Sequence, residues 1–174
     1  PRAVTVPLSK SEGHRTLILA ALAEGETLLP PLPPSGDLRA TMVCLRKMGA
    51  GLTETAEGLC IRPICRTGES TVAPIRPDCG ESGSTLRFLL PVAAAMGINA
   101  VFTGKGRLPQ RPVRELLAAM EQNGVTAEVR QEPWEIAVTG TLTPGVFHLP
   151  GKVSSQYVSG LLLALPLLAE DSEI

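Results

Sequence analysis

Apolar residues recur at helical spacing along the chain, in segments that resemble one another. Residues 11–29 and 82–102 each begin with serine, continue as an apolar helix pattern, and pass through a glycine into a β-prone stretch. Residues 154–174 begin in the same way. The spacing is regular, since Arg15 and Arg87 are 72 residues apart. The pattern therefore predicts a repeated structural unit.

A second helix is predicted after the first in two of these units. Apolar residues three or four apart mark it: Leu38, Met42, Leu45 and Met48 in one unit, and Val113, Leu116, Leu117 and Met120 in the next. Each helix is followed by a glycine suited to a left-handed cap, Gly49 or Gly124. Short strands are predicted at residues 52–55, 59–64, 126–130 and 135–140. The order is strand, helix, strand, helix and two strands, so we expect an α/β (α+β) chain of βαβαββ units packed around a shared axis.

The predicted units cover approximately residues 2–70, 71–143 and 144–174, the last of them truncated after its first helix. We therefore expect about two and a third repeats of one domain. Because the third unit is incomplete, we also expect the chain to be part of a longer protein.

Composition and charge exclude several classes of function. The formal net charge is −1 and aromatic residues make up 3%, so neither nucleic acid nor a membrane surface is an expected partner. No apolar run reaches the roughly 18 residues of a membrane span. The four cysteines form no C-x-x-C pair and lie far from the two histidines, so we expect free thiols in a reducing cytosol and no metal site.

The starts of the three first helices combine small residues with cations. They are Ser9, Lys10 and Ser11 with Arg15; Gly80, Ser82, Gly83 and Ser84 with Arg87; and Lys152, Ser154, Ser155 and Gln156. A helix start has unpaired amides and a partial positive charge, and glycine lets an oxyanion reach those amides. Ordinary serine capping is the alternative, but three such starts with cations favour anion binding. If they converge, they would surround one polyanionic small molecule.

Two further residues near these starts are candidates. His14 is expected on a helix face near the first start, either in contact with a ligand or half-exposed. Arg111 precedes Pro112, which suits the first position of a helix, so its guanidinium would be a positioned donor, whereas Arg114 is expected to be solvated. A P-loop and a nucleophile elbow are both excluded, because residues 145–153 and 80–84 depart from the required spacing.

Four motifs together resemble the 5-enolpyruvylshikimate-3-phosphate (EPSP) synthase family. They are P-x-SKS-x-x-x-R at 7–15, CGESGSTLRFLLP at 79–91, TGKGRLPQRP at 103–112 and GKVSSQYVSGLLLALPLL at 151–168. The resemblance implies transfer of the enolpyruvyl (carboxyvinyl) group from phosphoenolpyruvate to the 5-hydroxyl of shikimate 3-phosphate, with release of phosphate, in aromatic amino-acid biosynthesis. It also implies no metal or organic cofactor, a cytoplasmic monomer, and two inside-out α/β barrel-like domains of βαβαββ repeats, of which the second is absent here.

The resemblance also implies roles for single residues. Lys10 matches the catalytic lysine between the two substrates. Ser11 and Arg15 match residues that hold the shikimate carboxylate, and Ser154 and Ser155 match those that hold its 3-phosphate. Gly83 and Arg111 match groups on the phosphoenolpyruvate phosphate, and Gln156 matches the glutamine near both ligands.

The chain departs from the family pattern at Leu8 and Glu81, where glycine and asparagine are usual. Family members are more than twice as long, and their catalytic carboxylates align beyond residue 174. We therefore expect the isolated chain to bind ligand at most and to have no turnover. Two alternatives are a UDP-N-acetylglucosamine enolpyruvyl transferase, against which Lys10-Ser11 and residues 153–156 argue, and a non-catalytic anion-binding half-domain.

Overall fold

The computed structural model describes residues 9–65 and 73–174. The leading strand predicted for the first unit, together with Pro7 and Leu8 of the first motif, lies outside the described residues. The described chain is a mixed helix and sheet structure with two three-stranded sheets.

Residues 10–62 contain two helices and one sheet. In chain order the elements are α1 (Lys10–Leu22), β1 (Thr27–Leu29), α2 (Gly36–Lys47), β2 (Gly51–Thr55) and β3 (Gly58–Arg62). The sheet order is β1-β3-β2, and both neighbouring pairs are antiparallel. The predicted first and second helices of this unit are confirmed.

Residues 83–140 repeat the same order of elements. They form α3 (Gly83–Ala95), β4 (Ala100–Thr103), a 3-10 turn at Leu108–Gln110, α4 (Arg114–Glu121), β5 (Val125–Gln131) and β6 (Trp134–Gly140). The sheet order β4-β6-β5 corresponds to β1-β3-β2. The predicted leading strand is reduced to two parallel bridges, Ile75 with Ala100 and Asp78 with Thr103.

Residues 145–174 contain α5 (Ser155–Ala164), a 3-10 turn at Leu165–Leu167, and a parallel bridge between Val146 and Glu173. The bridge resembles the pairing of Ile75 with Ala100 in the preceding unit, since each leading segment pairs in parallel with the segment after its first helix.

The predicted glycine caps are confirmed by the backbone. Gly49 has φ +106° and Gly124 has φ +88°, both in the region that residues with a Cβ rarely adopt. At Gly49 the helix end is also closed by hydrogen bonds, because the amide of Ala50 donates to the carbonyl of Leu45. These caps turn the chain from α2 and α4 into the hairpins that follow.

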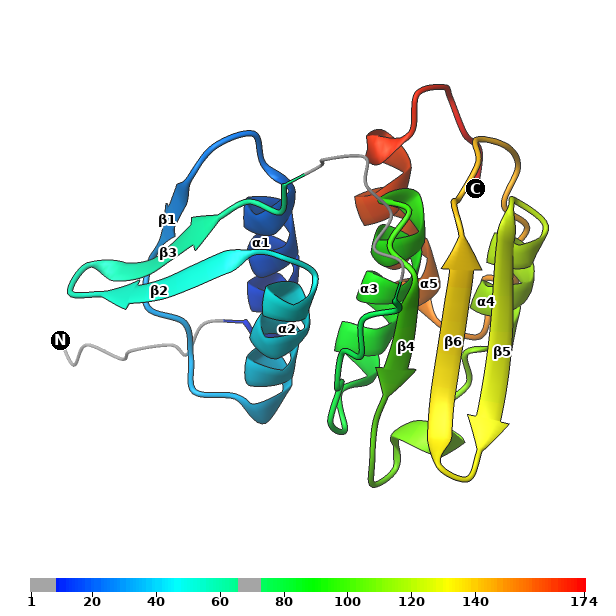
Figure 1. The fold of residues 1–174 in the computed structure, drawn as a ribbon, viewed down its shortest axis with the longest axis horizontal. Coiled ribbons are helices and arrows are strands. Elements are labelled where there is room, and N and C mark those ends of the chain that lie inside the picture. Colours follow the sequence, from blue (N-terminus) through cyan, green and yellow to red (C-terminus); the bar gives the residue numbers. More distant parts are fainter. Residues whose placement is uncertain (1–8, 66–72) are drawn as a thin grey trace, which may run out of the picture.

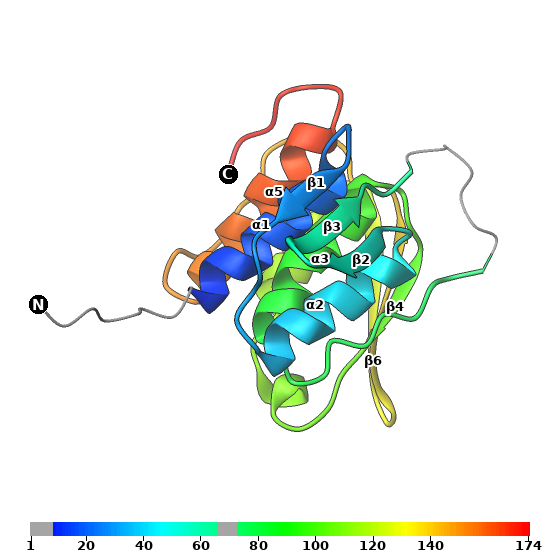
Figure 2. The same ribbon diagram turned by 90° about the vertical axis from the view of Figure 1, so that its left-hand side faces the viewer.

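In Figure 1, α1, α2 and α3 lie between the sheet β1-β3-β2 and the sheet β4-β6-β5, and α5 packs on α3. Figure 2 looks onto the sheet β1-β3-β2 and shows the helices behind it. Buried side chains of the helices, the strands and the segment before α5 form one apolar core, in which the largest are Phe88, Phe102, Phe147 and Tyr157. Helix α5 packs closely on α3, because Gly160 has no Cβ where the backbone of Arg87 passes. This arrangement brings the starts of α1, α3 and α5 within reach of one another.

The predicted role of Pro112 is wrong. Helix α4 begins at Arg114 with Val113 as its N-cap, so Pro112 precedes the cap instead of occupying the first helical position. The carbonyl of Pro112 instead accepts hydrogen bonds from the Arg87 side chain. Arg111 follows the 3-10 turn, and its amide donates to the carbonyl of Leu108.

Candidate active site

Serine side chains cap all three helices that begin with the predicted anion-binding pattern. Each hydroxyl accepts a hydrogen bond from an amide of the first turn: Ser9 from Glu12 at 3.4 Å, Ser82 from Thr85 at 3.2 Å, and Ser154 from Gln156 at 3.2 Å. Ordinary capping thus accounts for one serine at each start. The residues after these caps, and the cations around them, distinguish the starts chemically.

Gly83, the first residue of α3, lies against two guanidinium groups. A Cβ at this position would lie 2.8 Å from Nη1 of Arg111 and 3.3 Å from Nη1 of Arg87. Because glycine lacks this atom, both cations come close to the first turn of α3, where the helix also has its unpaired amides. The arrangement can accept an oxyanion between backbone N–H groups and side-chain charge.

Arg87 is held in place by neutral groups. Its Nε and Nη2 donate to the carbonyl of Pro112 at 3.2 and 2.8 Å, and its Nη1 donates to Oε1 of Gln156 at 2.7 Å. The guanidinium also lies over the ring of Tyr157, 5.7 Å from its centroid. The residue is only 8% exposed. Burial lowers the pKa of Arg87, and the charge of Arg111 acts in the same direction. An arginine still stays protonated, so this positive charge is available to an anion.

Gln156 connects α5 to α3. Its amide nitrogen donates to Oγ of Ser84 at 2.7 Å, while its carbonyl oxygen accepts from Arg87. These two bonds, both to residues of α3, fix the orientation of the side-chain amide. The structure thus brings the predicted residue Gln156 together with the start that carries Gly83.

Ser11 and Arg15, predicted to act together, are in direct contact. Nη1 of Arg15 donates to Oγ of Ser11 at 2.6 Å and to its carbonyl at 2.9 Å. Nη2 reaches across to α5 and donates to Oγ of Ser159 at 2.9 Å, and the guanidinium lies 5.0 Å from the ring centroid of Phe88. Arg15 therefore contacts one residue from each of α1, α3 and α5.

Lys10 is paired with α2. Its Nζ lies 2.8 Å from Oδ2 of Asp37, and the two side chains are 57% and 35% exposed. An exposed pair of this kind contributes little to stability, typically below about 1 kcal/mol. Lys10 is thus a largely exposed charge at the start of α1, with Asp37 as its partner.

The expected exposure of His14 is wrong. The residue is 1% exposed, and its Nδ1 lies 2.7 Å from Oγ1 of Thr41. Burial lowers the pKa of His14 to about 4, with Lys10 and Arg15 acting in the same direction and Asp37 against them. The imidazole is therefore neutral at physiological pH.

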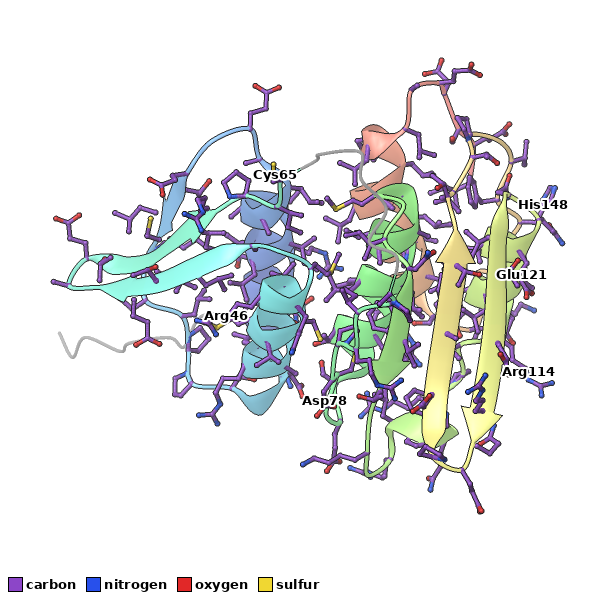
Figure 3. All side chains as sticks on the ribbon, in the orientation of Figure 1. Arg46, Cys65, Asp78, Arg114, Glu121 and His148 are labelled. Atoms are coloured by element: carbon purple, nitrogen blue, oxygen red, sulfur yellow. The ribbon has the colours of Figure 1, made fainter. Side chains whose placement is uncertain are left out.

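Ser154 and Ser155 lie at the start of α5, where Ser155 is exposed and Ser154 is half-buried. Within the described residues their only side-chain hydrogen bond is the cap from Ser154 to the Gln156 amide. Arg114 is exposed, as predicted, and in Figure 3 it points away from α3, on the same side as Glu121 and His148. Arg114 is therefore a solvated cation, whereas Arg87 and Arg111 lie against the start of α3.

A cavity of about 310 Å³ lies elsewhere, against α2 and the β2–β3 hairpin, where Pro33, Leu38, Met42 and Leu59 line it. None of the predicted site residues lines this cavity. Over residues 9–65 and 73–174 no helix is long and apolar enough to cross a membrane, and no group of three or more His, Cys, Asp or Glu is arranged to hold a metal. All four cysteines are free, with Sγ of Cys44 and Cys79 4.0 Å apart.

A sequence profile of the family described as EPSP synthase (3-phosphoshikimate 1-carboxyvinyltransferase) matches residues 2–174. The chain belongs to the EPSP synthase family. A 3-phosphoshikimate 1-carboxyvinyltransferase from Clostridium perfringens is 37% identical over 171 residues, and one from Clostridium botulinum is 38% identical over 175 residues. A solved EPSP synthase from Acinetobacter baumannii is similar with a TM-score of 0.77 at 28% identity, covering 93% of this chain.

The chain spans less than half the length of the EPSP synthases that it matches. It covers 40% of each of the two clostridial relatives and 38% of the Acinetobacter structure, whereas each of the clostridial relatives matches 98% of this chain. The groups described above therefore lie in a part of the chain that aligns with EPSP synthases along almost its whole length.

Glu81, one of the two departures from the EPSP synthase pattern, is exposed and lies against Gly106. A Cβ on Gly106 would collide with the Glu81 carboxyl group. The carboxylate thus extends toward the turn at residues 106–107, and no ion pair of Glu81 occurs within the described residues.

Sequence reasoning missed Asp37 and Ser159, and it named Arg87 without giving it a contact. Ser159 stands 72 residues after Arg87, so the repeat pointed to it. For Asp37 no signal of this kind existed, because a carboxylate at a helix start is also the ordinary complement of the helix dipole.

Proposed function

We propose that the whole protein transfers the enolpyruvyl group from phosphoenolpyruvate to the 5-hydroxyl of shikimate 3-phosphate and releases phosphate. The observation that carries this proposal is the family match over residues 2–174. The geometry supports it, since cations and bare amides gather at helix starts without any carboxylate bonded to Arg15 or Arg87 among the described residues. Two anionic substrates need such neutralisation before they can react with each other.

The phosphoenolpyruvate phosphate is proposed to bind at the start of α3. The Gly83 amide and the Arg111 guanidinium would contact it, with Arg87 and Gln156 completing the surroundings. Lys10 would lie between the two substrates as the catalytic cation, exchanging its bond to Asp37 for one to the substrate.

Shikimate 3-phosphate is proposed to bind between α1 and α5. Ser11 and Arg15 would hold its carboxylate, because the Arg15 guanidinium is already oriented by Ser159 and Phe88. The hydroxyls of Ser154 and Ser155 at the start of α5 would donate to the 3-phosphate, where the helix dipole adds favourable charge.

The reaction proposed is an addition followed by an elimination. The 5-oxygen of shikimate 3-phosphate loses its proton and bonds to C2 of phosphoenolpyruvate, while the methylene carbon gains a proton. Loss of a proton from that carbon and departure of phosphate then restore the double bond. The residues assigned here bind, orient and neutralise charge, and none of them is assigned the proton transfers.

We also propose a finer description of the fold. The described part is taken as about two and a third βαβαββ units of an inside-out barrel-like domain, one of two domains in the whole enzyme. The helices that lie between the two sheets and the matching sheet orders support this proposal (Figure 1). We expect no turnover from the isolated 174 residues.

The division of the site is tested in the whole protein by calorimetric titration with shikimate 3-phosphate and by phosphate release at varied phosphoenolpyruvate. Arg111→Ala is expected to raise the KM of phosphoenolpyruvate at least about tenfold, since a charge-assisted contact is lost, with little change in the Kd of shikimate 3-phosphate. Ser154→Ala combined with Ser155→Ala is expected to do the reverse.

Arg114→Ala is the matched control, because Arg114 is an exposed arginine only three residues from Arg111 and points away from the site. It should change neither constant. Loss of the same ligand in both test variants would refute the division of the site, and absence of phosphate release from the unaltered protein would refute the proposed function.

A further inference from the structure

A continuous chain of buried hydrogen bonds joins α1, α2 and α3. Nδ1 of His14 lies 2.7 Å from Oγ1 of Thr41, and Thr41 lies 2.7 Å from Oγ1 of Thr85. Thr85 in turn donates to Oγ of Ser82 at 2.7 Å. All four residues are at most 2% exposed, so water does not compete for these bonds.

The two threonine hydroxyls share a further acceptor, the carbonyl of Asp37. Thr41 can donate to Thr85 or to this carbonyl, which lies 3.4 Å from its Oγ1. Thr85 can donate to Ser82 or to the same carbonyl. Each hydroxyl has a single proton, so these acceptors compete for it.

The unpaired nitrogen of the His14 ring indicates the tautomer. Nε2 is buried and has no hydrogen-bond partner within the described residues. Because an unpaired buried acceptor is tolerated better than an unpaired buried N–H, the proton is assigned to Nδ1, which donates to Thr41. The ring also meets Phe88 edge-on, with centroids 6.2 Å apart, so it contacts α3 directly.

The chain of hydrogen bonds ends at the residue that caps α3. Ser82 accepts from both the hydroxyl and the amide of Thr85, and the next residue is Gly83. The carbonyl of Asp37 also lies within 3.3 Å of the Thr85 hydroxyl, while the Asp37 carboxylate binds Lys10. The network therefore links the first turn of α3 to α1, which carries Lys10, and to α2, which carries Asp37.

We propose that Thr85 and Thr41 are positioning residues, which fix the first turn of α3 so that the Gly83 amide faces the phosphate of phosphoenolpyruvate. The inference rests on the proposed function. The inference goes beyond the proposed function, because it assigns part of the affinity for phosphoenolpyruvate to side chains that are buried behind the start of α3. Short, directional bonds between hydroxyls define a helix position more narrowly than apolar contacts between the same helices would.

The test compares Thr85→Val with Thr85→Ser in the whole protein. Valine keeps the shape of threonine and removes the hydroxyl, whereas serine keeps the hydroxyl. Thr85→Val is expected to raise the KM of phosphoenolpyruvate about fivefold, as expected for one net hydrogen bond. Its kcat and the Kd of shikimate 3-phosphate should stay within about twofold of the unaltered values, and Thr85→Ser should restore the KM.

Asn123→Ala is the matched control. Asn123 is 7% exposed, and its side chain donates to the carbonyls of Ala119 and Val146, near the other end of α3. This variant should lose stability while the KM of phosphoenolpyruvate stays unchanged. A Thr85→Val protein that loses stability in the same way, without a change in that KM, would overturn the proposal.

Thr41→Val provides a second test if Thr85→Val does not fold. It leaves the bond from Thr85 to Ser82 in place and removes the link to His14, so we expect a KM increase of about twofold. An unchanged KM in a folded Thr41→Val protein would overturn the proposal. Failure of the proposed function is distinguishable, because the unaltered protein would then release no phosphate from the two substrates.

Discussion

The starts of α1 and α3 have the same serine cap but differ in their first helical residue. At α1 this residue is Lys10, whose side chain is mostly exposed and bound to Asp37. At α3 it is Gly83, buried, with two guanidinium groups against it. The α3 start therefore has two guanidinium groups beside its first turn, whereas the charge at the α1 start is paired with a carboxylate.

A shared sequence pattern thus places two different kinds of charged group at the two helix starts. Arg87 is held by Pro112 and Gln156, so little conformational entropy is lost when a ligand arrives. Lys10 would lose more conformational entropy on binding, because its exposed side chain would become ordered. We expect the α3 start to determine affinity and Lys10 to contribute mainly to the reaction step.

Lowering the pH should destabilise the folded protein through His14, which connects α1 to α2 and α3. This is the largest effect that we expect. The pKa of His14 is about 4 in the folded state and about 6.5 in an unfolded chain, so between these pH values only the unfolded state binds the proton. The free energy of unfolding should therefore decrease as the pH falls from 7 to 4, by up to about 3 kcal/mol from this group. Denaturant unfolding of the whole protein at several pH values measures this change.

His14→Gln is the control for this prediction, because glutamine does not titrate. The difference in unfolding free energy between the unaltered protein and His14→Gln should shrink toward pH 4. Parallel curves for the two proteins over this range would contradict the assigned burial of a neutral imidazole.

Gly83→Ala should have the next largest effect. The added methyl group would lie 2.8 Å from Nη1 of Arg111, so the guanidinium must move away, and the methyl would also cover the amide. We expect the KM of phosphoenolpyruvate to rise about tenfold, as for loss of one charge-assisted hydrogen bond, with the Kd of shikimate 3-phosphate unchanged. Steady-state phosphate release measures the KM.

Gly36→Ala is the matched control, since Gly36 begins α2 and a Cβ added there would meet no atom within 4 Å. It should change neither constant. If Gly83→Ala bound phosphoenolpyruvate normally, the contrast between the α1 and α3 starts would have no functional meaning.

Ser159→Ala should have the smallest effect. Nη2 of Arg15 loses its acceptor on α5 but keeps its contacts to Ser11 and Phe88. We expect the Kd of shikimate 3-phosphate to rise about threefold, measured by calorimetry. Thr16→Ala, on the same helix as Arg15, should have no effect, because among the described residues the Thr16 hydroxyl bonds only to the Glu12 carbonyl within α1. A change in the KM of phosphoenolpyruvate instead would assign Ser159 to the other substrate.

Much of the fold could be predicted from local patterns. The helical spacing of Leu38 and Leu45, or of Leu116 and Met120, depends on one face of one helix. The caps at Gly49 and Gly124 depend on backbone conformation alone. The contact of Ser11 with Arg15 was also accessible, since the two residues are four apart on one helix.

The parts that could not be predicted depend on contacts between helices. His14 and Thr41 are 27 residues apart, and Thr41 and Thr85 are 44 apart, so no local pattern indicates that they form one chain of hydrogen bonds. The exposure of His14 was predicted wrongly for this reason, because the side chains opposite it decide its burial. Pro112 was misplaced because α4 begins only at Arg114, and the contact that its carbonyl makes is with Arg87, a residue 25 positions earlier.

Gly160 shows how a residue without any functional group can limit the evolution of a binding site. Its missing side chain makes room for the backbone of Arg87, and the same contact between α3 and α5 determines whether Gln156 reaches Ser84. Even one added carbon would separate the two helices. Selection for activity would therefore act on position 160 only through the room that a side chain would need there. Variation at this position should be as restricted as at residues that contact the substrates.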